Sequence, residues 1–188
     1  METWIQTYTG RKFWPLDPKP EDVHILDIAH ALSMKCRYSG HCKRFYSIAE
    51  HSCHVHDVLT GKALEQSPII KMWGLLHDAG EAYLCDVPRP VKPELKGFKR
   101  LERNIQEVVA RKFGLYSLGF FPEVSVADNA MLHAEYLQNM QQLRELVWEV
   151  PEPPADVKLG YWYPDRAKRE FMARFRLLRC QLKGGNTK

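Results

Sequence analysis

The chain has 188 residues, which is enough for one domain with its own hydrophobic core and too few for two domains of ordinary size. Hydrophobic residues make up 45% and charged residues 27%, proportions that exclude an intrinsically disordered or fibrous chain. The 27 Lys and Arg exceed the 23 Asp and Glu by a formal charge of +4, which suits a small anionic ligand better than a nucleic acid polymer.

Three further features bear on where the protein works. No apolar run approaches the roughly 18 residues of a membrane-spanning helix, so no membrane partner is expected. The segment from Met1 to Trp4 lacks the basic start and apolar stretch of a signal peptide. The five cysteines include no Cys-x-x-Cys pair, which favours reduced thiols over disulfides or a structural zinc site. Together these features predict a cytoplasmic protein.

The first third of the chain changes from irregular to helical. Residues 1–20 contain a glycine and three prolines and predict an irregular arm with at most a short hairpin. A first helix is expected over 27–32, followed by a loop over 35–46. Ser47 and Glu50 have the spacing of a capping box, in which the serine accepts a backbone hydrogen bond and the glutamate reaches back. A second helix is therefore expected from this box to about residue 59.

The rest of the chain reads as helices separated by prolines and glycines. Four further helices are expected, over about 67–82, 99–113, 122–148 and 164–182. Gly114 is a natural carboxy-terminal cap for the helix before it, and residues 184–188 are expected to be a frayed tail. The sequence thus predicts an all-α protein with a single domain over 1–188 and about six helices.

Titratable residues fall within the apolar stripes of three expected helices. They are His51 in the second helix, His77 and Asp78 in the third, and Asp128 in the fifth. A lone buried histidine is commonly a satisfied core residue, and a lone buried aspartate is commonly a cap. A buried carboxylate is otherwise costly unless it is paired or bound to a cation. Because one divalent cation would account for all four groups together, we predict a metal site.

Competing motifs are weaker or absent. Cys53, His54 and His56 lie close to His51 in the sequence, but successive residues of a helix point about 100° apart. His54 can therefore stay near His51, whereas Cys53 and His56 should face elsewhere. The chain contains no H-E-x-x-H, no P-C-x-x-C of the zinc deaminases, no G-x-S-x-G and no P-loop.

One family resemblance rests on an ordered set of segments. They are Ala49-Glu50-His51-Ser52, Leu76-His77-Asp78-Ala79-Gly80-Glu81-Ala82 and Ala127-Asp128. This set resembles the His…His-Asp…Asp signature of HD-domain phosphohydrolases. The flanking segments 36–41, 45–49 and 86–92 are most similar to the small 5′-deoxynucleotidases of the YfbR and YfdR type, and small phage dATP triphosphohydrolases are also similar.

The resemblance implies a helical HD domain that holds one divalent metal ion. The implied ligands are His51, His77, Asp78 and Asp128. The ion is left open among Co, Mn, Zn, Fe, Ni and Mg. Two-metal branches of the family use additional histidines between the His-Asp pair and the last aspartate. Residues 79–127 contain no histidine, which implies a mononuclear site.

The resemblance also implies which residues act on the substrate. Glu81 and Asp86 match acidic residues that handle water and substrate. The candidate substrate-binding residues are Arg37, Tyr38, His41 and Lys92, the first two matching an Arg-aromatic pair in which Trp is more common than Tyr. Homo-oligomers are common in the family, so a homo-oligomer is expected here.

We therefore expect a phosphohydrolase that removes the 5′-phosphate from deoxynucleoside monophosphates. Two alternatives stay open: a triphosphohydrolase that releases tripolyphosphate from a deoxynucleoside triphosphate, and a helical interaction module with a structural metal. Glu81 beside a complete ligand set favours an enzyme, since a binding module has no need of that carboxylate. Trp4, Trp14 and Trp73 are expected to pack in the arm or core rather than to stack on a base.

Overall fold

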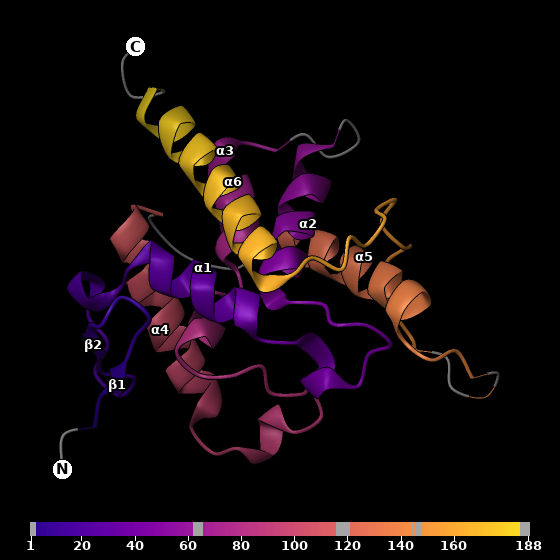
Figure 1. Cartoon of the computed structure of the whole chain (residues 1–188), viewed down its shortest axis with the longest axis horizontal. Coiled ribbons are helices and arrows are strands. Elements are labelled where there is room, and N and C mark those ends of the chain that lie inside the picture. The colour runs from indigo at the N-terminus through magenta and orange to yellow at the C-terminus, as the bar shows by residue number, and fades with distance from the viewer. Residues whose placement is uncertain (1–2, 62–65, 116–120, 144, 146–147, 185–188) are drawn as a thin grey trace.

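Six α-helices make up most of the part of the chain that the computed structural model describes, which is residues 3–61, 66–115, 121–143, 145 and 148–184 (Figure 1). They are α1 (Ile25–Met34), α2 (Ile48–Thr60), α3 (Pro68–Leu76), α4 (Phe98–Phe113), α5 (Pro122–Asn139) and α6 (Pro164–Gly184). Short 3₁₀ turns connect them: η1 (Pro20–Asp22), η2 (Arg37–Gly40), η3 (Ala79–Ala82) and η4 (Lys92–Glu94). The predicted all-α class is confirmed.

The amino-terminal arm contains the short hairpin that its composition allows. Strand β1 (Ile5–Gln6) pairs antiparallel with β2 (Lys12–Phe13), and Phe13 is fully buried against the helices. No helix in the described ranges combines the length and the apolarity that crossing a bilayer requires.

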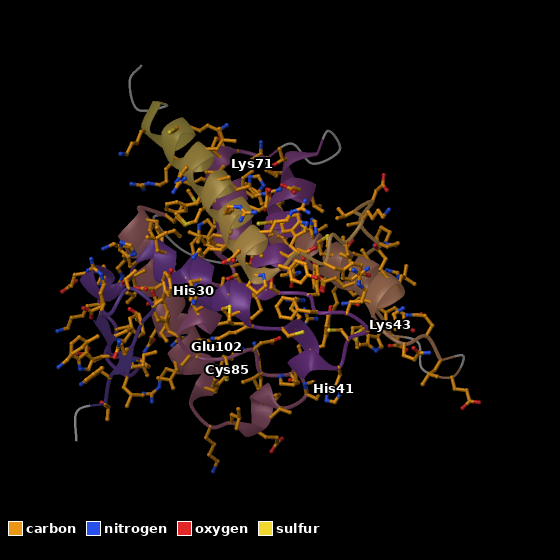
Figure 2. All side chains as sticks on the ribbon, viewed as in Figure 1. His30, His41, Lys43, Lys71, Cys85 and Glu102 are labelled. Carbon is orange, nitrogen blue, oxygen red and sulfur yellow. The ribbon has the colours of Figure 1, made fainter. Side chains whose placement is uncertain are left out.

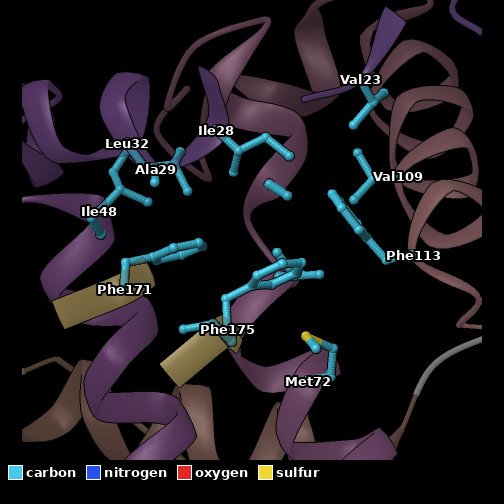
Figure 3. Close-up of a cluster of buried hydrophobic side chains, with 14 of the residues drawn as sticks. Val23, Ile28, Ala29, Leu32, Ile48, Met72, Val109, Phe113, Phe171 and Phe175 are labelled. Carbon is cyan, nitrogen blue, oxygen red and sulfur yellow. The ribbon is translucent and has the colours of Figure 1, made fainter. Parts of the chain in front are cut away.

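The main core lies where α6 crosses α1, α2 and α3 (Figure 3). Phe171 and Phe175 of α6 insert among apolar side chains of α1 and α2 on one side and α4 on the other, and Ile28 and Ile48 are fully buried there. Burying such a side chain contributes roughly 1.5–3 kcal/mol. This packing fixes α2, which carries His51, in the middle of the molecule.

The capping box at the start of α2 is present in one half only. Ser47 Oγ accepts from the Glu50 backbone N–H at 3.1 Å, as predicted. The Glu50 carboxylate instead accepts from the backbone N–H groups of Gly160 at 2.8 Å and Trp162 at 2.6 Å. The side chain is fully buried, so these bonds satisfy a carboxylate that the core would otherwise leave unpaired. Glu50 thereby ties the segment before α6 to the helix that carries His51.

Replacing Glu50 with Gln is expected to lower the free energy of unfolding by about 1–3 kcal/mol, because an amide cannot accept from two backbone donors as strongly as a carboxylate does. Urea denaturation of the metal-free protein measures this loss. Glu107→Gln is the matched control, since the Glu107 side chain is 53% exposed on α4. Equal stability of both variants would show that the Glu50 contacts contribute nothing.

The third helix ends earlier than the sequence predicts, and the cause is a side chain of α4. An uninterrupted helix would pair the Leu76 carbonyl with the Gly80 N–H. Instead the Gln106 amide lies between them: its Nε2 donates to Leu76 O at 2.7 Å, and its Oε1 accepts from Gly80 N at 3.3 Å. A side chain inserted into the helical ladder breaks it. His77 and Asp78 therefore lie at the break between α3 and η3.

The fifth helix was expected to run to Trp148 and ends at Asn139. Asn139 closes it by binding a distant loop: its side chain accepts from Arg44 N and donates to Arg44 O, both at 3.0 Å. Its carbonyl accepts from Lys43 N at 2.8 Å. Trp148 lies beyond the helix and stacks on Tyr136, with ring centroids 4.9 Å apart. The tail expected over 184–188 falls largely on residues 185–188, outside the described ranges.

Candidate metal centre

Three neighbouring helices bring the predicted ligands together (Figure 1). His51 comes from α2, His77 follows the end of α3, and Asp128 lies in α5. Their nearest donor atoms all lie within 4.8 Å of one another. His51 Nε2 is 3.2 Å from His77 Nε2 and 3.1 Å from Asp128 Oδ1. These three residues form a cluster that could hold a metal ion.

Asp78 contacts the same two histidines. Its Oδ2 lies 3.2 Å from His77 Nε2 and 3.8 Å from His51 Nε2. The break between α3 and η3 directs His77 and Asp78, although adjacent in sequence, toward one point. The other two histidines of α2 face other partners. His54 Nε2 lies 3.4 Å from Glu50 Oε1, and His56 Nδ1 lies 2.9 Å from Asp57 Oδ1.

The partners of the two imidazoles decide which ring nitrogens face the cluster. His77 Nδ1 lies 2.8 Å from the Gly74 carbonyl, which can only accept, so Nδ1 carries the hydrogen. His51 Nδ1 lies 2.6 Å from Glu135 Oε1, and a carboxylate likewise requires a donor there. In the neutral rings both Nε2 lone pairs then point inward. This is the arrangement in which histidines bind metal ions.

The charges around the cluster favour a cation. Burial alone would lower the pKa of His77, but the carboxylates of Asp78 and Asp128 raise it to about 9. Burial alone would raise the pKa of Asp128, but His51 and His77 lower it to about 2. The two carboxylates thus stabilise positive charge between them, which protons on the imidazoles or a divalent ion can supply. Imidazole and carboxylate ligands suit a first-row transition metal, so the residues present fit the predicted ion.

Glu135 supports the cluster from behind. It lies two turns after Asp128 on α5, is fully buried, and binds His51 Nδ1. The same carboxylate accepts from Arg37 Nε at 3.0 Å and from the Tyr38 hydroxyl. Burial would raise the pKa of Glu135, but Arg37 and His51 lower it to about 2. Glu135 is therefore an anion that orients one ligand and anchors the loop over 37–40.

That loop has an unusual backbone. Tyr38 and Ser39 have φ of 56° and 50°, in the left-handed region that residues other than glycine adopt rarely. The loop is held by the bonds to Glu135 and by a bond from Arg37 N to Tyr46 O at 2.9 Å. Arg37 Nη1 also lies 3.6 Å from Asp78 Oδ2. The guanidinium therefore lies between two acids of the site.

A cavity of about 1380 Å³ opens on the other side of the cluster. His77, Asp78, Glu81, Lys92 and Asp128 line it, together with residues of α4 and the beginning of α5. This volume exceeds the roughly 300–1,000 Å³ of most pockets for small molecules. The cluster therefore faces a cavity large enough for a small molecule.

Glu81 is an acid in this cavity with one carboxylate oxygen left unsatisfied. Its Oε2 is buried and finds no hydrogen-bond partner in the described part of the chain, whereas its Oε1 lies 3.8 Å from Lys92 Nζ. Lys92 pairs more closely with Glu102, at 2.8 Å. Burial, together with the Asp78 and Asp86 carboxylates, raises the pKa of Glu81 to about 9. Glu81 is thus set to hold a proton near neutral pH.

Relatives of this chain support part of the resemblance. Over 133 residues, which are 71% of this chain and 70% of the relative, it is 38% identical to a protein of Escherichia coli named "Uncharacterized protein YfdR". The chain belongs to the YfdR family. It is also 31% identical over 195 residues to "Uncharacterized protein RCAP_rcc00048" of Rhodobacter capsulatus, covering 96% of this chain and 98% of that one. No protein-family model matches the chain.

The structure separates the candidate residues of this YfdR-family chain into two groups. Glu81 and Lys92 line the cavity beside the cluster, and Asp86 acts on Glu81 through its charge. Arg37 and Tyr38 are not among the described residues that line the cavity. His41 is exposed at the end of η2, in the lower right part of Figure 2.

Two important residues of this YfdR-family site were missed from the sequence. Glu135 lies on the same face of α5 as Asp128. A histidine that binds a metal through Nε2 usually needs a hydrogen-bond acceptor at Nδ1, and this requirement could have pointed to Glu135. Gln106 gives no such signal, because its effect on α3 exists only once α4 has packed against that helix.

Proposed function

We propose that this chain is a metal-dependent phosphohydrolase of the HD-domain type, which removes the 5′-phosphate from deoxynucleoside monophosphates. The observation that carries the proposal is the inward-facing cluster of His51, His77 and Asp128, with the unsatisfied carboxyl group of Glu81 in the same cavity. The choice of deoxynucleotides rests on the resemblance to 5′-deoxynucleotidases.

Each residue has a role that its position favours. His51, His77 and Asp128 would hold the metal, with Asp78 as a fourth ligand. A divalent ion there would supply an acidified water and polarise a phosphoryl oxygen. Glu81 donates its proton to the leaving 5′-oxygen, because a carboxyl group with a raised pKa is a general acid near neutral pH.

Arg37 has a different role from the simple phosphate grip that the resemblance implies. Its guanidinium contacts Glu135 and Asp78, so it first neutralises these acids and fixes their orientation. A planar five-donor group can do this and still bind a phosphoryl oxygen that enters beside Asp78. Tyr38 holds the same loop through its hydroxyl bond to Glu135.

Glu81→Gln is expected to keep the metal and to slow turnover by about 10²-fold or more, because the amide has no acidic proton to donate. In the parent enzyme kcat falls as pH rises through the pKa of Glu81, which lies near 9 in the metal-free protein and lower beside a bound cation. The variant loses this alkaline decline. A pH series of initial rates, with metal content measured in parallel, checks both effects. An unchanged pH profile would remove Glu81 from the acid role.

The triphosphohydrolase is retained as a second candidate because of the cations on α4. Lys99, Arg100 and Arg103 line the same cavity on the side of Lys92 and Glu81. Arg103 Nε lies 3.9 Å from Glu107, whereas Lys99 and Arg100 pair with no carboxylate among the described residues. Cations free of carboxylate partners would bind the additional phosphates of a deoxynucleoside triphosphate.

One screen tests these alternatives together. Purified protein is incubated with all deoxynucleoside mono- and triphosphates and the matching ribonucleotides, in Mn, Co, Zn or Mg, and the phosphate product is identified. Orthophosphate from monophosphates supports the leading proposal, and tripolyphosphate supports the second. If no nucleotide is hydrolysed with any metal, the enzyme proposal fails and the interaction module with a structural metal becomes the better explanation.

A further inference from the structure

Two aromatic side chains line the cavity next to the ligand cluster. Trp73 of α3 and Phe121, which precedes α5, have ring centroids 5.9 Å apart and planes tilted by 47°. Leu115 and Val124 also line the cavity, and Val124 lies one turn after Phe121. The two tilted rings and these aliphatic side chains form an apolar wall, which we call the aromatic end. It contrasts with the cationic side formed by Lys92 and the first turns of α4.

Trp73 carries an unsatisfied donor at this end. Its indole Nε1 is buried and has no hydrogen-bond partner in the described part of the chain. Leaving a buried donor unpaired costs about 1–3 kcal/mol, so most indole nitrogens that are withdrawn from water find an acceptor. The ring also packs partly against the main core, which fixes its position. Packing, rather than a hydrogen bond of the indole N–H, therefore holds this ring in place.

The aromatic end lies at a defined distance from the metal ligands. Trp73 precedes His77 by one turn of α3, and Phe121 precedes Asp128 by about two turns of α5. With a rise of 1.5 Å per residue these offsets correspond to about 6 and 10 Å along the helices. In a 5′-nucleotide the sugar separates the base from the phosphorus by a comparable length. A phosphate at the cluster would therefore place the base beside Trp73 and Phe121.

We propose that the aromatic end is the base-binding subsite of this site. Trp73 and Phe121 contact the base through their rings. The inference rests on the proposed function for the position of the phosphate. It assigns Trp73 a specificity-determining role in addition to the packing role expected from sequence, which the contact of its ring with the main core confirms.

The first test measures binding without turnover. NMR titrations follow 2′-deoxynucleosides, which lack phosphate, binding to metal-free protein. Trp73→Leu is expected to weaken binding by about 10-fold or more, since loss of an aromatic partner to a base costs that much. Trp73→Phe keeps a ring, loses only the N–H and should weaken binding less. Trp14→Phe is the matched control, because Trp14 lies in the amino-terminal arm and outside the cavity lining.

The second test uses the holoenzyme with two substrates. For the best deoxynucleoside monophosphate, Trp73→Leu should raise KM about 10-fold. For 2-deoxyribose 5-phosphate, which has no base, the same variant should lower kcat/KM by a much smaller factor than it does for the nucleotide. Thermal unfolding shows whether Trp73→Leu folds, and Trp73→Phe provides the conservative comparison if it does not.

The outcomes separate this inference from the proposed function. Two results would overturn the base-binding subsite without affecting the proposed phosphohydrolase activity. One is equal hydrolysis of 2-deoxyribose 5-phosphate and nucleotides by the parent enzyme. The other is nucleoside binding that no folded Trp73 variant weakens. Nucleoside binding that depends on Trp73, in a protein that hydrolyses no phosphate ester, would support the subsite and reject the phosphohydrolase.

Discussion

Replacing Asp128 with Asn is expected to abolish turnover and to reduce metal affinity by at least about 100-fold. The substitution keeps the size of the side chain but removes a negative charge beside both histidines, where Asp128 Oδ1 lies 3.1 Å from His51 Nε2. A divalent ion loses a charged ligand and the charge balance of its site. Metal analysis of the purified variant and phosphate release from deoxynucleotides measure the two losses separately.

Asp165→Asn is the matched control for this variant. It makes the same chemical change at an exposed carboxylate in the first turn of α6, and we expect parental metal content and turnover. If Asp128→Asn retained its metal and its rate, the cluster would not be the reactive centre. Loss of turnover with full metal retention would make Asp128 a substrate-positioning residue rather than a ligand.

Glu135→Gln is expected to weaken metal binding by about 10- to 100-fold, although Glu135 itself is not a ligand. Replacing a residue that orients a metal-binding histidine typically lowers metal affinity by this factor. The amide can present its NH₂ to His51 Nδ1, which moves the ring hydrogen to Nε2 and removes the lone pair from the cluster. It also leaves the buried Arg37 with less negative charge, so the melting temperature should fall as well.

Calorimetric titration with Mn²⁺ and thermal unfolding of the metal-free protein measure these two effects. Glu149→Gln, at an exposed position after α5, is the control and should change neither. Parental metal affinity in Glu135→Gln would show that the bond to His51 does not set the tautomer, and would limit Glu135 to supporting the loop of Arg37.

The fold class and the residues of the candidate metal cluster could be predicted because their signals are local. Apolar periodicity located the helices, and the titratable residues interrupting it at His51, His77 and Asp128 identified the cluster that the structure assembles. The glycine after α4 and the prolines that begin α3, α5 and α6 marked helix ends by their own backbone chemistry. No knowledge of the tertiary structure was needed at these positions.

The features that were missed depend on contacts between distant segments. Gln106 breaks α3 by bonding Leu76 and Gly80 from another helix, and Asn139 ends α5 by bonding Arg44. Glu50 accepts hydrogen bonds from the backbone N–H groups of Gly160 and Trp162 instead of completing the capping box. In each case the side chain forms hydrogen bonds with residues that are distant in the sequence. Local sequence patterns do not predict such contacts.

The same reasoning explains why Trp73 was assigned to packing. Its spacing on α3 places it four residues before His77, where an apolar side chain belongs to the core. Only the packing of α3 against α4 and α5 leaves one part of the ring on the core and the other on the cavity.

A metal titration of activity tests the central claim most directly. Metal-free protein receives Mn²⁺ in increments at constant deoxynucleoside monophosphate, and bound metal and released phosphate are measured in the same samples. One site made of His51, His77, Asp78 and Asp128 predicts that phosphate release rises in proportion to bound metal and reaches its plateau at one ion per chain. Full binding of one ion without phosphate release, or release that proceeds equally without metal, would contradict the account.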